Sequence, residues 1–95
     1  ITTNVHIFDH AHINLNSTVS HDSRISRFVT ISPCCSVSGN VTLHEKVFLG
    51  TNSTILQGLT VGEGSTVGAG SVVLSDVGEG TTVVGVPAYP IGSSR

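Results

Sequence analysis

The stretch that decides the fold runs from residue 19 to residue 49 and reads VSHDSRISRFVTISPCCSVSGNVTLHEKVFL. Beginning with its first residue, every sixth position carries Val, Ile or Leu. The series continues in both directions, and its thirteen members are Ile1, Ile7, Ile13, Val19, Ile25, Ile31, Val37, Leu43, Leu49, Ile55, Val61, Val67 and Val73. An α-helix returns apolar residues every three or four positions, and hairpins would need turn pairs such as Asn-Gly. Neither pattern explains a period of six.

A chain that turns a corner every six residues and buries one aliphatic side chain per side forms a three-sided coil of eighteen residues. Residues eighteen apart then stack: Val19, Val37, Ile55 and Val73 on Ile1; Ile25, Leu43 and Val61 on Ile7; Ile31, Leu49 and Val67 on Ile13. A second column, two residues before the first, is mostly small or β-branched and suits the corners. We therefore predict an all-β fold, a left-handed parallel β-helix (a three-sided solenoid of about four coils), over residues 1–76.

The two ends of the predicted rod differ. The period fails after Asp76, and residues 77–95 are rich in Gly and Pro, so we expect a short irregular cap that ends in a disordered tail at residues 93–95. The chain contains no Met, and we expect it to be a piece of a longer product with a segment before Ile1. Flat faces and open strand edges favour self-association, most simply in a closed ring.

Composition narrows the classes of partner and compartment. Charged residues make up 11% of the chain and the net charge is −2. Because no basic stripe and no long apolar run occur, we predict neither nucleic acid nor membrane as a partner. The two cysteines, Cys34 and Cys35, are adjacent, which disfavours a disulfide between them. Two free thiols, with Cys35 as a small interior residue, indicate a reducing cytoplasm.

Five histidines are candidates for chemistry: His6, His10, His12, His21 and His44. One known use of histidines on such a rod is the zinc site of gamma-type carbonic anhydrases, where two ligands lie five residues apart and a third lies two coils away. No histidine pair here is separated by five, eighteen or thirty-six residues. The ligand spacing therefore fails, and we predict no metal site.

The second use of a histidine is general-base catalysis of acyl transfer, because imidazole exchanges its proton near neutral pH. His21 lies two residues after a core position and should point outward at a corner, where it is either a base or a plain surface residue. Asp22 follows and could orient the ring. Gly39 lies eighteen residues later, so its uncovered amide would face an oxyanion one coil away.

The chain resembles a known family of bacterial enzymes. The segment from Val19 to Val77, followed by GVPA at residues 85–88, is similar to the catalytic half of the bacterial sialic acid O-acetyltransferase and nucleotide-amino-sugar N-acetyltransferase family. The resemblance implies acetyl-CoA as co-substrate, a homotrimer, and an N-terminal nucleotide-binding domain that is absent from this chain. It also implies catalytic roles for His21, Asp22 and Gly39, although the family usually has Glu where this chain has Asp22.

The resemblance also implies where the substrates contact the chain. The pantetheine arm of acetyl-CoA would pass Gly39, Thr51, Gly58 and Ala69 in a groove between neighbouring rods, with Pro87 of GVPA near the adenine. Tyr89 stands where the family often has Lys or Arg. His12, Asn14 and Thr30 are predicted on the acceptor side, and Thr30 replaces a histidine that is frequent in the family.

The sequence therefore predicts acetyl transfer to an amine or hydroxyl of a sugar or nucleotide-linked sugar. Two alternatives stay open. The repeat by itself requires only a non-catalytic trimeric scaffold, and a zinc enzyme related to gamma-type carbonic anhydrases is the third possibility.

Overall fold

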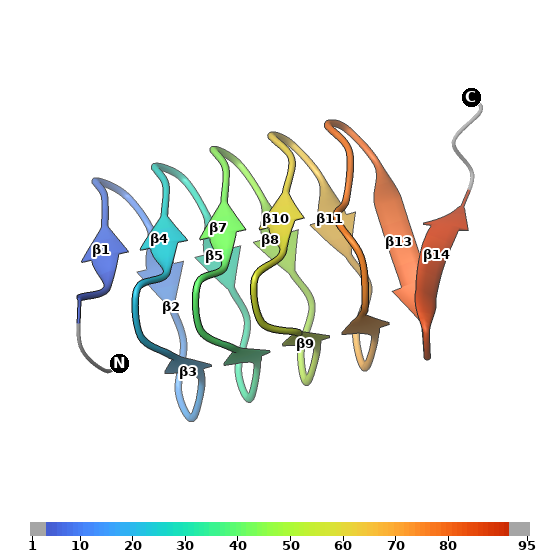
Figure 1. The fold of residues 1–95 in the computed structure, drawn as a ribbon, viewed down its shortest axis with the longest axis horizontal. Coiled ribbons are helices and arrows are strands. Elements are labelled where there is room, and N and C mark those ends of the chain that lie inside the picture. Colours follow the sequence, from blue (N-terminus) through green and yellow to red (C-terminus); the bar gives the residue numbers. More distant parts are fainter. Residues whose placement is uncertain (1–3, 92–95) are drawn as a thin grey trace.

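The computed structural model describes residues 4–91, which wind into a three-sided rod (Figure 1). Each side is one sheet. Sheet A contains β1 (His6–Ile7), β4 (Arg24–Ile25), β7 (Thr42–Leu43) and β10 (Thr60–Val61). Sheet B contains β2 (His12–Ile13), β5 (Thr30–Ile31), β8 (Phe48–Leu49), β11 (Thr66–Val67), β13 (Thr82–Gly85) and β14 (Ala88–Ile91). Sheet C contains β3 (Thr18–Val19), β6 (Ser36–Val37), β9 (Thr54–Ile55) and β12 (Val72–Val73).

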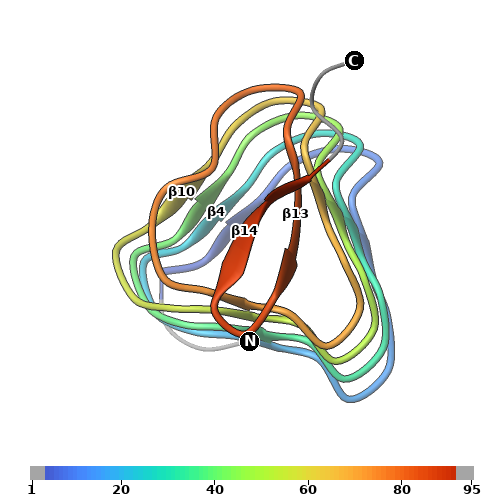
Figure 2. The same ribbon diagram turned by 90° about the vertical axis from the view of Figure 1, so that its right-hand side faces the viewer.

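The winding is left-handed and its register is eighteen residues. With the C-terminal end toward the viewer, the chain runs clockwise through sheets A, B and C as it approaches (Figure 2). Parallel pairs join Ile25 to Leu43 in sheet A and Val37 to Ile55 in sheet C. These pairs confirm the predicted stacks; Ile1, the first member of one stack, lies outside the described residues. Within residues 4–91 no helix is long and apolar enough to cross a membrane.

The core is the column of aliphatic side chains inside the rod. The hexad residues from Val19 to Val73 are at most 1% exposed, and the small column supplies buried Ser23, Ser53 and Cys35 between them. The preceding residue of each strand faces outward. Both cysteines are free, Cys34 is exposed, and the Cys35 thiol lies 3.1 Å from the carbonyl oxygen of Gly50. The predicted interior role of Cys35 is confirmed.

The corners share one backbone conformation. The fourth residue of each hexad, counted from the core residue, has a φ near +60° from Asn4 to Asn52, and glycine takes this position at Gly58, Gly64 and Gly70. Asn, Asp and Gly tolerate this left-handed conformation best, which explains their recurrence there. The turn leaves the third residue of the hexad at the outside of the corner, which is where His21 and Gly39 lie.

The C-terminal cap is more regular than the sequence suggested. Val77 bridges to Val61, and β13 pairs with β11 so that Val83 lies beside Val67 after 16 rather than 18 residues. The chain then reverses into an antiparallel hairpin of β13 and β14 that crosses the open end of the rod (Figure 2). The expectation of an irregular cap was wrong in this respect, because a coil shortened by two residues hides the repeat from a strict period of six.

The core stacks make a prediction about stability. Leu43 is fully buried between β4 and β10, so Leu43→Ala should lower the free energy of unfolding by about 2–5 kcal/mol through lost burial and a residual cavity. Thr42→Ala, on the outer face of the same strand, should cost less than about 1 kcal/mol. Urea unfolding followed by circular dichroism measures both, and equal losses would contradict this assignment of inner and outer faces.

Candidate active site

The candidate site lies at the corner where the chain passes from sheet C to sheet A, here called the C–A corner. Its outermost column is formed by the third hexad residues His21, Gly39, Gln57 and Ser75 in successive coils. The corner is held together by its backbone, because the Asn40 amide donates to the His21 carbonyl oxygen at 2.9 Å. The winding therefore places His21 and Gly39 in adjacent coils of one corner, as the sequence predicted.

The His21 ring covers Gly39. A Cβ atom added to Gly39 would lie 2.5 Å from Nε2 and 2.6 Å from Cε1 of His21. Any side chain at position 39 would therefore occupy the volume that the imidazole now fills. Glycine is required here by close approach of a neighbouring side chain, and this contact brings the Nε2 edge of the ring close to the backbone of Gly39.

Asp22 holds the other nitrogen of the ring. Its Oδ2 lies 3.2 Å from Nδ1 of His21, and both side chains are about half exposed. A carboxylate only accepts hydrogen bonds, so in a neutral imidazole that donates Nδ1–H to Asp22 the lone pair lies on Nε2. Asp22 has a φ of +59°, so the corner turn itself sets the position of this carboxylate. The predicted pair of His21 and Asp22 is thus present as a hydrogen-bonded unit.

The amide of Gly39 is available as a donor. Among the described residues, no group accepts a hydrogen bond from this amide. The carbonyl oxygens on both sides of it are engaged: that of Ser38 accepts from the Ser23 hydroxyl at 3.0 Å, and that of Gly39 accepts from the Gly58 amide at 3.0 Å. A free, fixed N–H beside an imidazole is the pairing that an oxyanion and a general base require. Ser23 was not among the site residues predicted from the sequence. Its only indication there was its place in the column of small residues that lie two positions before the core residues.

The predicted cofactor residues fall on more than one part of the rod. Gly58 lies at the C–A corner with Gly39 and has a φ of +80°. Thr51 and Ala69 lie at the corner between sheets B and C. Pro87 lies in the turn of the terminal hairpin after the exposed Val86. In one chain these residues do not form a single groove.

The predicted acceptor residues lie away from His21. His12 and Thr30 are neighbours in register on the outer face of sheet B, which is the side opposite the C–A corner. Asn14 uses its side chain to donate to the Ile31 carbonyl oxygen at 3.0 Å, so it links its coil to the next one. Within one chain the structure therefore joins His21, Asp22 and Gly39, and does not bring His12, Asn14 or Thr30 to them.

The remaining histidines have other surroundings. The His10 ring stacks on Phe28 with centroids 5.1 Å apart, and His44 lies near Glu63 and Glu79 at the corner between sheets A and B. Within residues 4–91 no three His, Cys, Asp or Glu side chains lie close enough to hold a metal ion together.

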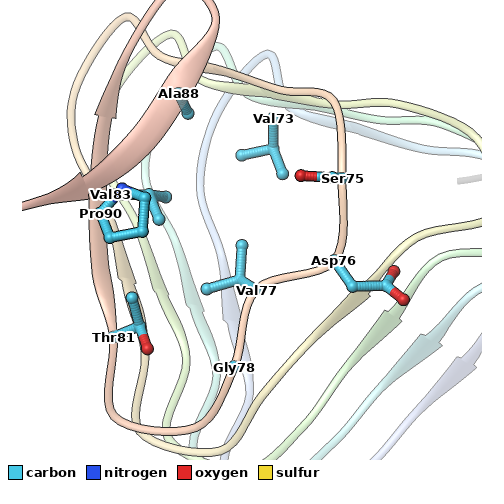
Figure 3. Close-up of a pocket in the computed structure, with 9 residues that line it drawn as sticks. All are labelled: Val73, Ser75, Asp76, Val77, Gly78, Thr81, Val83, Ala88 and Pro90. Carbon is cyan, nitrogen blue, oxygen red and sulfur yellow. The ribbon is translucent and has the colours of Figure 1, made fainter.

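A cavity of about 180 Å³ lies away from His21, near the C-terminal end of the same corner, where Ser75 is one of its lining residues. It occupies the C-terminal end of the rod, under the hairpin, and is lined mainly by Val73, Val77, Val83, Ala88 and Pro90 (Figure 3). Asp76 lies at its edge and accepts a hydrogen bond from the Thr60 amide at 2.8 Å. The lining is chiefly aliphatic and continuous with the core. We therefore interpret this cavity as the incompletely filled end of the core.

Part of the repeat matches a known family model. Residues 40–75 match the family model described as bacterial transferase hexapeptide (six repeats). GDP-perosamine N-acetyltransferase of Escherichia coli O157:H7 is 38% identical over 59 residues, which are 62% of this chain and 27% of that protein. WeeI from Acinetobacter baumannii AYE superposes with a TM-score of 0.91 at 36% identity, over 93% of this chain and 44% of WeeI.

A third relative is a solved complex. The acetyltransferase domain of PglB from Neisseria gonorrhoeae FA1090, in complex with acetyl coenzyme A, superposes with a TM-score of 0.86 at 38% identity, over 92% of this chain and 44% of that one. Residues 40–75 thus carry a repeat like that of the bacterial transferase hexapeptide model, and the fold is similar to that of the PglB acetyltransferase domain. The chain spans less than half the length of these relatives.

The contact between His21 and Gly39 makes a prediction about two glycines of one corner. Gly39→Ala should displace the His21 ring, yet cost little stability, because the clashing atoms belong to a side chain that can rotate. Gly58→Ala has open space around its new Cβ but a φ of +80°, so it should cost about 1 kcal/mol and leave the ring in place. Crystal structures and thermal unfolding of both variants test this, and a displaced ring in Gly58→Ala would contradict it.

Proposed function

We propose that this chain is the acetyl-transfer domain of an enzyme that moves an acetyl group from acetyl-CoA to an amine or hydroxyl of a sugar or nucleotide-linked sugar. The observation that carries the proposal is the packing of the His21 imidazole over Gly39, with Asp22 on its far nitrogen. The named activity of the GDP-perosamine N-acetyltransferase and the acetyl coenzyme A in the PglB complex support the substrate classes.

The reaction requires one proton transfer and one displacement. The acceptor amine or hydroxyl attacks the thioester carbonyl carbon while Nε2 of His21 takes its proton, and Asp22 stabilises the imidazolium that forms. The carbonyl oxygen becomes an oxyanion, which the Gly39 amide stabilises by a hydrogen bond. When the carbon–sulfur bond breaks, the proton held by His21 passes to the departing CoA thiolate. This sequence returns His21 to its starting state.

The test compares two exposed histidines in the full-length protein. His21→Ala should lower kcat about 10²–10⁴-fold, which is the contribution of a positioned general base. His44→Ala, at the corner between sheets A and B, should leave kcat within about twofold. Steady-state rates with acetyl-CoA and amino-sugar nucleotides or sialic acids measure both. A loss of only two- or threefold for His21→Ala would argue against the mechanism, and absence of CoA binding in calorimetry would favour a non-catalytic scaffold.

Charge distribution supports self-association through one side of the rod. Residues 11–20, 29–38, 47–56 and 65–74 contain no Asp, Glu, Lys or Arg. These segments form sheets B and C and the corner between them, and they expose Leu15, Phe48, Leu56 and Leu74. Charged residues are depleted in the centres of protein interfaces. We therefore propose that this side, here called the uncharged side, packs against further copies of the chain in a homotrimer.

A closed ring would also bring the predicted acetyl-CoA and acceptor residues of one copy close to the His21 corner of its neighbour. In such a ring each interface joins two different surfaces of neighbouring copies. Sheet B or the B–C corner of one copy can then lie opposite the C–A corner of the next. Thr51, Ala69, His12 and Thr30 would line the acetyl-CoA and acceptor sites from the neighbouring copy. We propose a cytoplasmic location for the assembly, in keeping with two free thiols.

The interface prediction uses two matched threonines. Thr54 on sheet C and Thr42 on sheet A are both half-buried and outward-facing first residues of their strands. Thr54→Arg should dissociate the trimer, because it places an unpaired charge in the interface, whereas Thr42→Arg should leave the trimer intact. Sedimentation equilibrium measures the mass of each species. A trimeric Thr54→Arg variant, or a monomeric wild type, would contradict the proposal.

A further inference from the structure

Ser23 is a buried polar residue that the mechanism above does not use. It follows the His21–Asp22 turn and precedes β4, and its side chain is completely buried. Its hydroxyl accepts a hydrogen bond from the Val41 amide at 3.2 Å and donates one to the Ser38 carbonyl oxygen at 3.0 Å. A hydroxyl has one proton, and the Val41 amide occupies an acceptor site, so the proton is directed at Ser38.

This bond acts on the peptide that carries the Gly39 amide. The Ser38 carbonyl and the Gly39 N–H belong to one planar unit, and in a trans peptide they point in opposite directions. Ser23 lies inside the rod, so a carbonyl drawn toward it leaves the N–H directed outward, on the side of the His21 ring. A hydrogen bond at the carbonyl also polarises the peptide and strengthens the N–H as a donor.

The other hydrogen bonds of this corner do not act directly on the peptide between Ser38 and Gly39. Asn40 donates to the His21 carbonyl and Gly58 donates to the Gly39 carbonyl, and these bonds fix the peptides after His21 and after Gly39. Among the described residues, only Ser23 contacts the Ser38 carbonyl by a hydrogen bond. Glycine at position 39 has no side chain to restrict rotation of the preceding peptide. Without the Ser23 hydroxyl, the plane of the oxyanion donor would be held only by its neighbours along the chain.

We infer that Ser23 is a positioning residue that holds the Gly39 amide toward the reacting carbonyl from inside the rod. The inference rests on the proposed acetyl transfer and adds to it a buried residue that touches neither substrate. Loss of such an anchor weakens transition-state stabilisation without removing the donor. We expect an effect smaller than the 10²–10³-fold loss that follows removal of an oxyanion donor itself.

The rod supplies a matched control. Ser65 is also completely buried, donates to the Gly78 carbonyl oxygen at 2.6 Å and accepts from the Thr81 amide at 3.2 Å. It thus makes the same pair of bonds at the corner between sheets A and B, away from His21. Cys35 supplies an intermediate case, because its thiol lies 3.1 Å from the Gly50 carbonyl oxygen in the equivalent arrangement. A thiol is therefore accommodated at this kind of position as a weaker donor.

The experiment measures kcat, KM for acetyl-CoA and thermal unfolding for Ser23→Ala, Ser23→Cys and Ser65→Ala in the full-length protein. Ser23→Ala should lower kcat about tenfold, with KM for acetyl-CoA and the midpoint of the pH–rate profile unchanged. Ser23→Cys should fall between Ser23→Ala and wild type. Ser65→Ala should lose a similar amount of thermal stability while kcat stays within about twofold.

The outcomes separate this inference from the proposed function. If Ser23→Ala lowers kcat no more than Ser65→Ala, the positioning role is wrong even when His21→Ala abolishes activity. If His21→Ala retains activity, the proposed function fails whatever Ser23 does. Should Ser23→Ala fail to fold, Ser23→Cys decides the question: wild-type kcat there would overturn the inference, and a severalfold loss at unchanged KM would support it.

Discussion

Parallel pairing between residues eighteen apart is the constraint on which the rest of the structure depends. Each two-residue strand is too short to be stable alone, and it is held by the coil before it and the coil after it. The aliphatic stack inside the rod fixes this register, because a slip of one residue would turn every core side chain outward. The register in turn decides which side chains meet at a corner. His21 meets Gly39 only because Val19 packs on Val37.

The corner adds a second constraint, which acts on the backbone. A left-handed residue at each turn leaves the preceding side chain at the outside of the rod. At most corners this position holds an ordinary surface residue, such as Arg27, which pairs with Glu45 of the next coil at 3.0 Å. At the C–A corner the same geometry instead stacks an imidazole on a glycine. The fold thus provides the same geometry at many corners, and the residue types decide which one can do chemistry.

The sequence was enough to predict the coil, the stacks and the pairing of His21 with Gly39, because all three follow from one period and from local turn chemistry. It was not enough to predict the pairing at the C-terminal end. There a coil shortened by two residues places Val83 beside Val67, so the eighteen-residue spacing no longer holds. The sequence also missed the role of Ser23, since a buried serine in a column of small residues has no signature apart from its hydrogen bonds. Thr51 and Thr30 were assigned to the acetyl-CoA and acceptor sites by resemblance, and within one chain both lie on other parts of the rod than His21.

That separation has a physical reason. The interior of the rod is filled by its own side chains, and its cavity lies under the terminal hairpin rather than beside His21. A solenoid of this kind can offer substrates only its outer surface, and an isolated corner is too convex to exclude water from a reacting thioester. A second surface must close over the corner for the Gly39 amide to act in a medium of low dielectric constant. In the proposed trimer the uncharged side of another copy would meet this need, so assembly and catalysis would depend on the same surface.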